Sequence, residues 1–276
     1  MKTMDPSSAE TRQRIDWPAV ALTVVTVCVL TFILAPIAIT MLVSFNKGSY
    51  IVFPPEGLSL RWYKAFFDDY WWIMVFKNSL LIALPTMAVS TTVGVLAALG
   101  YMKRTFRGRN VINLIIMMPF LVPGIIIGIC LLMFAHRIGL SNTYAIVIAG
   151  HSLWATPTVF LLVQAVLSGY DFEIEDAARD LGAGPIKTFF LITLPCIRTG
   201  VLTAMIFSFI TSFGEFSIAL FLTAPATMTL PVQIWNSLKY EVSPIVAAVS
   251  TIMIVITLAA IAVGAKFAGV KTLSER

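Results

Sequence analysis

The sequence predicts an all-α membrane protein with six transmembrane helices. Hydrophobic residues make up 58% of the 276-residue chain and charged residues only 12%, and the mean hydropathy of +0.90 lies far above the range of water-soluble domains. A helix that crosses a bilayer needs roughly 20 mainly apolar residues. Segments of this kind cover residues 18–44, 73–101, 111–135, 143–168, 199–222 and 243–265. An even number of spans places both ends of the chain on the same side.

The basic residues indicate which side that is, because short loops rich in Lys and Arg face the cytoplasm. Thirteen of the 19 basic residues lie before the first span, after the last one, or in the loops after the second and fourth spans. They are Lys2, Arg12, Arg14, Lys103, Arg104, Arg107, Arg109, Arg179, Lys187, Arg198, Lys266, Lys271 and Arg276. We therefore predict a cytoplasmic N-terminal segment (1–17), a single transmembrane domain (18–265) with a cytoplasmic loop at 169–198, and a cytoplasmic C-terminal tail (266–276). The net charge of +5 is a topology signal and does not indicate nucleic-acid binding.

The first span is predicted to be a retained helix, because no small-residue cleavage site follows it in the expected place. The external loop after it, about residues 46–72, carries an aromatic cluster made of Trp62, Tyr63, Phe66, Phe67, Tyr70, Trp71 and Trp72. Such a cluster is typical of a short helix at the level of the lipid headgroups. Contact with a soluble partner outside the membrane is the alternative. In the last external loop, 223–242, residues 232–238 are candidates for a short helix near a pore mouth.

The middle spans contain residues that bend helices or bring them close together. Prolines occur inside the predicted spans at Pro36, Pro85, Pro119, Pro123 and Pro157, and each tends to bend its helix. Gly124 and Gly128 form a GxxxG pair, which indicates close helix packing within the fold or with a second subunit. Lys77 and Asn78, at the outer end of the second span, are expected to reach towards the headgroups.

Glu215 is the one carboxylate that falls well inside a predicted span. An ionisable group in lipid is costly unless it faces water or a partner, so it is a candidate functional residue. In the structural alternative, Glu215 pairs with Lys77 or Arg137 near the outer surface, or binds backbone donors freed around Gly214. The candidate substrate-pathway residues are Thr211, Ser212 and Glu215.

No metal site or catalytic chemistry is predicted. His151, in the fourth span, has no second ligand at metal-binding spacing and is expected to be a hydrogen-bonded packing residue, with a pathway or metal role as the alternative. Cys28, Cys130 and Cys196 are scattered and support neither a disulfide nor a metal pair. The sequence has no HExxH motif, no GxSxG elbow and no phosphate-binding P-loop, so any ATP that drives this protein must bind another polypeptide.

The predicted cytoplasmic loop contains a polar stretch, Glu175-Asp176-Ala177-Ala178-Arg179-Asp180-Leu181-Gly182, followed by Ile192-Thr193-Leu194-Pro195. The two alanines favour a helix that a partner surface can approach closely, and Gly182 and Gly184 permit a sharp turn at its end. Pro185 suits the first turn of a second short helix. The pattern predicts a rigid helical hairpin that projects from the membrane domain towards a soluble partner.

This spacing resembles the EAA loop of ABC importer permeases, and the chain matches that pattern at Ala177, Ala178, Gly182, Ile192, Leu194 and Pro195. The acidic residue in register is Asp176, and Glu175 lies one residue earlier. The resemblance implies that this loop couples the membrane domain to an ATPase. The coupling residues that it implies are Glu175, Asp176, Ala177, Ala178, Gly182, Ala183, Ile192, Leu194 and Pro195.

Further segments resemble the spermidine/putrescine-type permeases, namely residues 60–63, 121–124, 192–195, 229–232 and 247–251. The resemblance implies a type I ABC importer permease fold, paired with a second permease subunit in a heterodimer. It also implies two cytoplasmic ATP-binding subunits that carry ATP and Mg, and a periplasmic substrate-binding protein. The chain itself is then a transport subunit without a cofactor and not an enzyme, and the implied solute is a polyamine. An amino-acid derivative, a phosphonate, iron or thiamine as the solute, or a secondary transporter, are the alternatives.

Overall fold

The structure is a computed structural model that describes residues 17–103, 105–240 and 243–267. The predictions for residues 1–16, for Arg104 and for residues 268–276 lie outside these ranges. The described chain is largely helical and contains one isolated β-bridge, between Asn46 and Leu58. Its elements are α1 (Trp17–Val43), α2 (Arg61–Asp68), α3 (Tyr70–Lys103), α4 (Arg109–Leu121), α5 (Gly124–Arg137), α6 (Tyr144–Leu167), α7 (Glu173–Asp180), α8 (Pro185–Thr188), the π-helix η1 (Phe189–Thr193), α9 (Leu194–Phe213), α10 (Ala219–Leu222), the 3-10 helix η2 (Pro225–Thr227), α11 (Leu230–Tyr240) and α12 (Ile245–Phe267).

Five helical segments of the described chain are long and apolar enough to cross a membrane, and α4 and α5 pass the same test only as a bent pair, which is either a broken sixth span or a re-entrant loop. The prediction of one continuous helix over 111–135 is wrong, because α4 and α5 meet at an angle of 101°. Val122 between them is extended, with φ −99° and ψ 128°. A residue that precedes a proline is driven out of the helical region, and Pro123 follows it. The other predicted prolines, Pro36, Pro85, Pro119 and Pro157, all lie inside helices that continue through them.

The fifth span also differs from its prediction, 199–222. One apolar helical stretch runs from Pro185 to Phe213 and so includes α8, η1 and α9. It ends at Gly214, and α10 follows as a separate short helix. The polar hairpin is therefore connected directly to a membrane-crossing helix.

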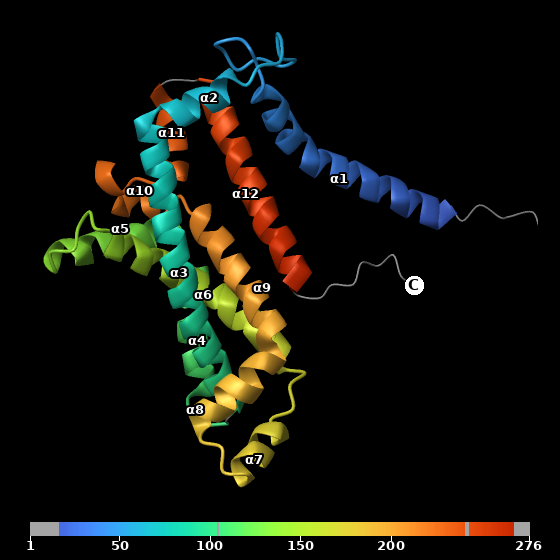
Figure 1. The fold of residues 1–276 in the computed structure, drawn as a ribbon, viewed down its shortest axis with the longest axis vertical. Helices are drawn as coiled ribbons and strands as arrows, with labels where there is room; N and C mark the ends of the chain where they lie inside the picture. Colours follow the sequence, from blue (N-terminus) through green and yellow to red (C-terminus); the bar gives the residue numbers. More distant parts are fainter. Residues whose placement is uncertain (1–16, 104, 241–242, 268–276) are drawn as a thin grey trace, which may run out of the picture.

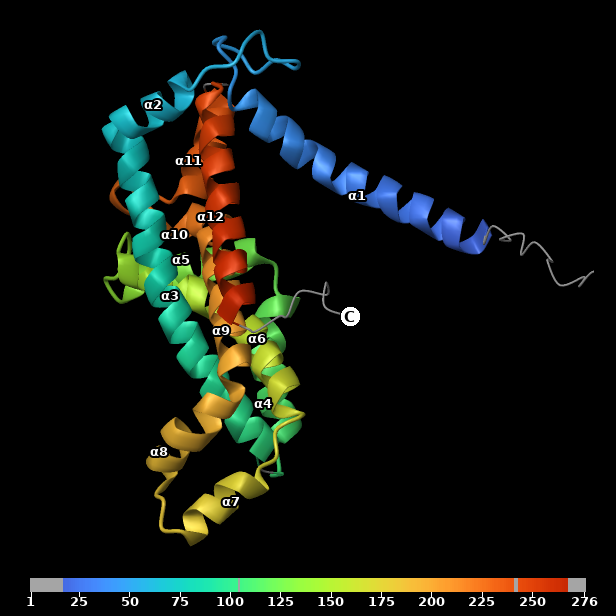
Figure 2. The same cartoon turned by 45° about the vertical axis from the view of Figure 1, so that its right-hand side comes forward.

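Helices α3, α6 and α9 form the centre of the bundle (Figures 1 and 2). Two glycines allow their close approach. A Cβ atom on Gly94 of α3 would lie 2.5 Å from Val159 Cγ1 of α6, and one on Gly200 of α9 would lie 2.3 Å from Val166 Cγ2 of α6. The buried hydroxyls of Ser90 and Ser208, 2.5 Å apart, join α3 to α9. Interhelical hydrogen bonds and small residues are the usual contacts where lipid removes the hydrophobic driving force.

The GxxxG pair packs within the fold. A Cβ atom on Gly124 would lie 3.1 Å from Ser217 Cβ, and one on Gly128 would lie 3.2 Å from the Cα atom of Ile218. Helix α5 therefore lies against the segment that leads into α10. The junction between α4 and α5 is thus close to the junction between α9 and α10.

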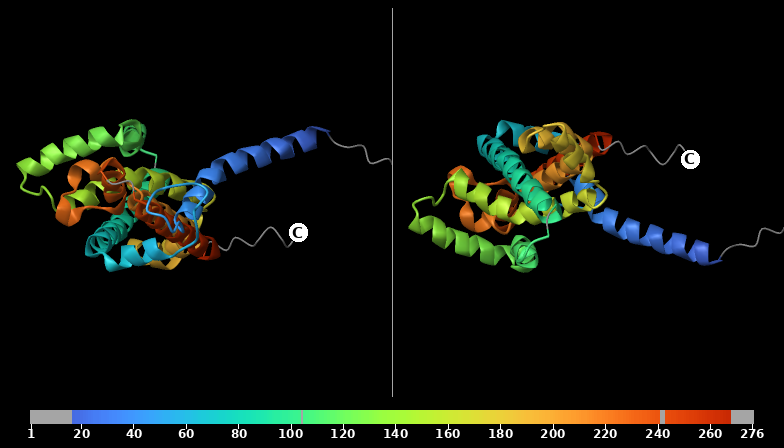
Figure 3. Two further views of the ribbon diagram at one scale, coloured as in Figure 1. Left: turned by 90° about the horizontal axis from the view of Figure 1, so that it is seen from above. Right: turned by 90° about the horizontal axis from the view of Figure 1, so that it is seen from below.

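Helix α1 stands apart from the bundle and extends away from it beyond α12 (Figures 1, 2 and 3). None of its most apolar 18-residue window is buried by other parts of the described chain. Its side chains are almost all apolar, so this helix presents a continuous hydrophobic surface.

At the opposite end of the bundle from α7, the aromatic loop forms the predicted short helix, α2 (Figure 1). Its cluster is divided between two environments, because Phe66 and Trp72 are buried while Phe67 and Tyr70 are exposed. The predicted helix at 232–238 is also confirmed, as part of α11.

The expectation that Asn78 reaches the headgroups is wrong. Asn78 is buried and donates hydrogen bonds of 3.0 Å to the carbonyls of Ala226 and Met228, and it accepts one of 2.7 Å from the Tyr144 hydroxyl. Next to it, the Ser79 hydroxyl accepts a 2.8 Å bond from the Leu230 amide. The amide side chain is buried because the 226–230 segment supplies its partners, and this segment is thereby fastened to α3.

Candidate functional site

The polar loop folds as the predicted helical hairpin, which we define as residues 173–188 and call the docking hairpin. It projects below the bundle, at the end opposite α2 and α11 (Figures 1 and 2). Gly182 ends α7 in the left-handed region, with φ +87°, where only glycine is comfortable. Its N–H donates to the Arg179 carbonyl at 2.8 Å and that of Ala183 donates to the Ala178 carbonyl at 3.0 Å, so the last carbonyls of the helix are satisfied.

The tip of the docking hairpin is apolar although its sequence is charged. Leu181 is 90% exposed and Ile186 is 73% exposed, and Phe190 and Leu191 continue this surface along η1. Sequence reasoning did not single out these residues. The sequence pattern that could have identified them is the presence of large apolar side chains at a turn between charged residues. Exposed apolar side chains of this kind, rimmed by polar groups, are typical of a surface that contacts another protein or a membrane.

The two neighbouring carboxylates, Glu175 and Asp176, have different environments. The Asp176 side chain is 70% exposed, and its carboxylate meets Arg179 on the next turn at 3.3 Å. The Glu175 side chain is only 4% exposed and points back towards the bundle. It accepts a hydrogen bond of 2.8 Å from Thr193 Oγ1 and pairs with Lys103 at the end of α3, and Arg179 lies 3.7 Å away.

These partners keep Glu175 ionised. Burial alone raises the pKa of a carboxyl group, but the hydrogen bonds from Lys103 and Thr193, together with the positive charges of Lys103 and Arg179, hold the pKa of Glu175 below its ordinary value. Sequence spacing could not reveal Lys103 as the partner, because it lies 72 residues earlier in the chain.

The other predicted coupling residues fall into two groups. A shallow hollow on the hairpin brings together Ala178, Gly182, Ala183 and Ile192, with Leu181 at its edge. Ala177 is exposed beside it. Leu194 and Pro195 do not reach the hairpin tip, because they form the first turn of α9.

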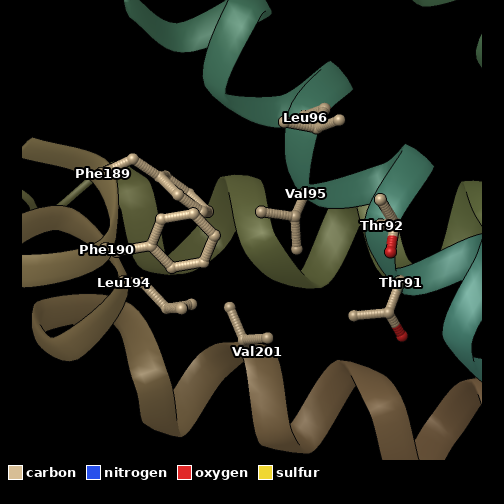
Figure 4. A pocket seen from close by; sticks show the side chains of 8 residues that line it. All are labelled: Thr91, Thr92, Val95, Leu96, Phe189, Phe190, Leu194 and Val201. Carbon is tan, nitrogen blue, oxygen red and sulfur yellow. The ribbon is translucent and has the colours of Figure 1, made fainter. Parts of the chain in front are cut away.

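Leu194 instead lines an apolar cavity of about 400 Å³ between α3, η1 and α9 (Figure 4). Phe189 and Phe190 enclose it on one side, and Val95 and Val201 face each other across it. The cavity lies beside the π-helical turn, where the backbone departs from regular α-helical geometry.

Glu215 does not lie within a continuous helix, contrary to its predicted position. It follows the end of α9 and is 7% exposed. Its two oxygens accept hydrogen bonds of 2.8 Å from the amides of Ile218 and Ala219. The structure thus shows contacts with backbone donors after Gly214, one of the structural alternatives, and shows no ion pair with Lys77 or Arg137.

His151 lies between Ser212 of α9 and Glu215. Its Nδ1 lies 2.9 Å from Ser212 Oγ, and its Nε2 lies 3.4 Å from Glu215 Oε2. His151 and Ser212 are both buried, and Thr211 is half-buried. The prediction of a hydrogen-bonded packing histidine is confirmed. Among the described residues, no group of three His, Cys, Asp or Glu side chains is placed to hold a metal ion.

A bundle of long apolar helices, from which a polar hairpin with an apolar tip projects, is the architecture of a multi-pass membrane protein. Residues 90–268 match the family described as "Binding-protein-dependent transport system inner membrane component", and the chain belongs to this family.

Several relatives agree with this assignment. The chain is 32% identical over 231 residues to the putrescine transport system permease protein PotI of Escherichia coli (strain K12), covering 81% of this chain and 82% of that protein. It is 29% identical over 231 residues to the spermidine/putrescine transport system permease protein PotC of Haemophilus influenzae, covering 84% and 90%. The chain is therefore the permease component of an ABC importer in the inner membrane, a transport component and not an enzyme.

Solved structures show the same fold. A bacterial ABC transporter involved in the import of the acidic polysaccharide alginate superposes with a TM-score of 0.73 at 16% identity, over 93% of this chain and 96% of that one. The alginate transporter has also been solved in complex with an alginate pentasaccharide-bound periplasmic protein.

Proposed function

We propose that the docking hairpin is the surface through which a cytoplasmic ATP-binding subunit drives this permease. The observation that carries the proposal is the exposed apolar tip, Leu181 and Ile186, on a rigid and well-capped turn. Ala177 and Gly182, which match the EAA pattern, and Asp176, at its acidic position, lie in the same hairpin. Two such ATP-binding subunits would bind ATP and Mg²⁺, and this chain would transmit their movement.

Leu181→Ala tests this proposal. Truncating an exposed leucine that inserts into a partner removes its buried apolar contact, worth about 1 kcal/mol and therefore about a fivefold loss of affinity. We expect the ATP-binding subunit to dissociate from the variant about fivefold more readily in a titration of detergent-solubilised complex. Leu58→Ala, at a leucine that is 77% exposed at the opposite end, should bind normally. Unchanged affinity of Leu181→Ala would remove the hairpin as the docking surface.

We propose that the end of the bundle bearing the docking hairpin faces the cytoplasm, together with the segments 1–17 and 266–276. The described basic residues support this orientation. Lys103 ends α3, Arg109 begins α4 with Arg107 in the loop between them, and Arg179 belongs to α7 of the hairpin; a cluster of basic residues of this kind is typical of cytoplasmic loops.

A reporter that fluoresces only in the cytoplasm tests this orientation. It should fluoresce when fused after Arg276 or inserted at Arg107, and it should stay dark when inserted near Pro55 in the loop before α2. Since an inserted reporter samples the side on which its loop emerges, fluorescence at Pro55 would reverse the topology.

We propose a polyamine as the solute and Thr211, Ser212 and Glu215 as residues of its pathway. The putrescine and spermidine/putrescine permeases among the relatives support the solute class. Phe216, which follows Glu215, and Trp235 line a hollow, and the centroids of their rings lie 5.4 Å apart. Aromatic ring faces attract ammonium groups such as those of a polyamine. Lys239 Nζ already lies 5.0 Å from the Trp235 ring. A second permease subunit in a heterodimer and a periplasmic substrate-binding protein complete the proposed importer.

A further inference from the structure

Glu175 connects three segments that are distant in the sequence. Its carboxylate meets Lys103 on the last turn of α3, Thr193 at the end of η1, and Arg179 on its own helix. A carboxylate that is 4% exposed and already bound by these groups is not available to an outside partner. It holds the docking hairpin to the membrane helices.

Helix α3 carries this connection across the whole bundle. It is unbroken from Tyr70 to Lys103, and Lys103, which comes 25 residues after Asn78, lies about 38 Å further along the axis at a rise of 1.5 Å per residue. Lys103 holds the docking hairpin at one end. At the other end, Asn78 and Ser79 hold the 226–230 segment by three hydrogen bonds to its backbone. One continuous helix therefore binds both the hairpin and the loop that precedes α11.

We propose that Glu175 is a positioning residue that fastens the docking hairpin to α3, so that movement of the hairpin is transmitted along α3 to the 226–230 segment on the far side of the membrane. This rests on the proposed docking of an ATP-binding subunit. An ionised carboxylate paired with a lysine suits such a connection, because breaking the pair would leave Glu175 buried without its main countercharge. In this proposal, α3 is the structural element whose position is influenced by nucleotide at one end and by solute at the other.

The test measures movement at the far end directly and does not depend on the identity of the solute. Thr229 is 2% exposed and its hydroxyl has no hydrogen-bond partner among the described residues, so Thr229→Cys gives a buried reporter thiol. Cys28, Cys130 and Cys196 are replaced by serine. The importer complex in proteoliposomes is treated with a membrane-impermeant maleimide, with and without ATP and vanadate. We expect nucleotide to change the labelling rate at least fivefold.

In this background, Glu175→Gln and Lys103→Met should reduce the nucleotide-dependent change to less than twofold while ATP hydrolysis continues. Lys103→Arg keeps the charge and should retain the response. Glu56→Gln, which neutralises an exposed carboxylate outside the docking hairpin, is the control and should also retain it. Asn78→Leu breaks the connection at the other end of α3 and should lose the response as Glu175→Gln does.

Two outcomes would overturn the proposal. One is a full labelling response in Glu175→Gln or Lys103→Met. The other is release of the ATP-binding subunit from Glu175→Gln, which would make Glu175 a docking contact and leave the proposed function intact. A separate result would show that the hairpin is not the docking surface: in that case Leu181→Ala would bind the ATP-binding subunit with unchanged affinity.

Discussion

Replacing Gly182 by aspartate should abolish transport while the protein still inserts into the membrane. Gly182 has φ +87°, and a side chain in this region costs about 1–2 kcal/mol. No other atom lies within 4 Å of a Cβ atom built there, so the new carboxylate would project into the space that the ATP-binding subunit is proposed to occupy. A desolvated charge adds a penalty of a few kcal/mol. Together these effects correspond to about a hundredfold loss of uptake and of solute-stimulated ATP hydrolysis.

Two further variants separate backbone strain from charge. Asparagine has nearly the shape of aspartate and a similar tolerance of the left-handed conformation but carries no charge, so Gly182→Asn should retain more uptake than the aspartate variant. Gly184 has φ −70° and open space around it, so Gly184→Ala should transport normally. Normal uptake by Gly182→Asp would contradict docking at this turn.

Glu215→Gln should lower polyamine uptake roughly tenfold. The substitution keeps the shape of the side chain but removes its negative charge, and with it an attraction for a cationic solute worth about 1–3 kcal/mol. ATP hydrolysis without solute should persist, because the docking hairpin lies at the other end of the bundle (Figure 1). Radiolabelled putrescine uptake into cells is the measurement, and Glu56→Gln, at an exposed carboxylate before α2, is the control.

The structure gives this experiment a second readout. Both Glu215 oxygens accept backbone hydrogen bonds, and a glutamine amide offers only one acceptor for the two donors. If the variant accumulates poorly or melts at a lower temperature, Glu215 mainly stabilises the start of α10. If the variant is stable and takes up putrescine normally, the pathway does not use its charge.

Composition and apolar length were sufficient to predict most of the long apolar helices. The predicted spans 18–44, 73–101, 143–168 and 243–265 each lie within a few residues of α1, α3, α6 and α12. The broken spans were harder to predict. Prolines at five positions carry the same local signal, yet only at Pro123 is the helix broken. There Gly124 and Gly128 pack against Ser217 and Ile218, a contact that no local pattern reveals.

The docking hairpin was predicted as a unit because its turn is local: Gly182 ends one helix and Pro185 starts the next. The separate environments of Glu175 and Asp176 were not predicted. Sequence spacing tells which carboxylate matches a motif. It does not tell which one is buried, because the burial of Glu175 depends on Lys103, a residue of α3 that is far away in the sequence. Asn78 was misinterpreted for the same reason, since its partners lie 148 and 150 residues later.

The glycine contacts between the central helices limit where this chain can flex. Val159 and Val166 of α6 already occupy the space beside Gly94 and Gly200, so α3, α6 and α9 cannot slide past one another without a steric clash. Torsional freedom is left where regular hydrogen bonding stops, at Val122–Pro123 and at Gly214. Helices α3, α6 and α9 thus form a closely packed unit beside two breaks in regular helix, and we expect conformational changes of this chain to include rotation about these breaks.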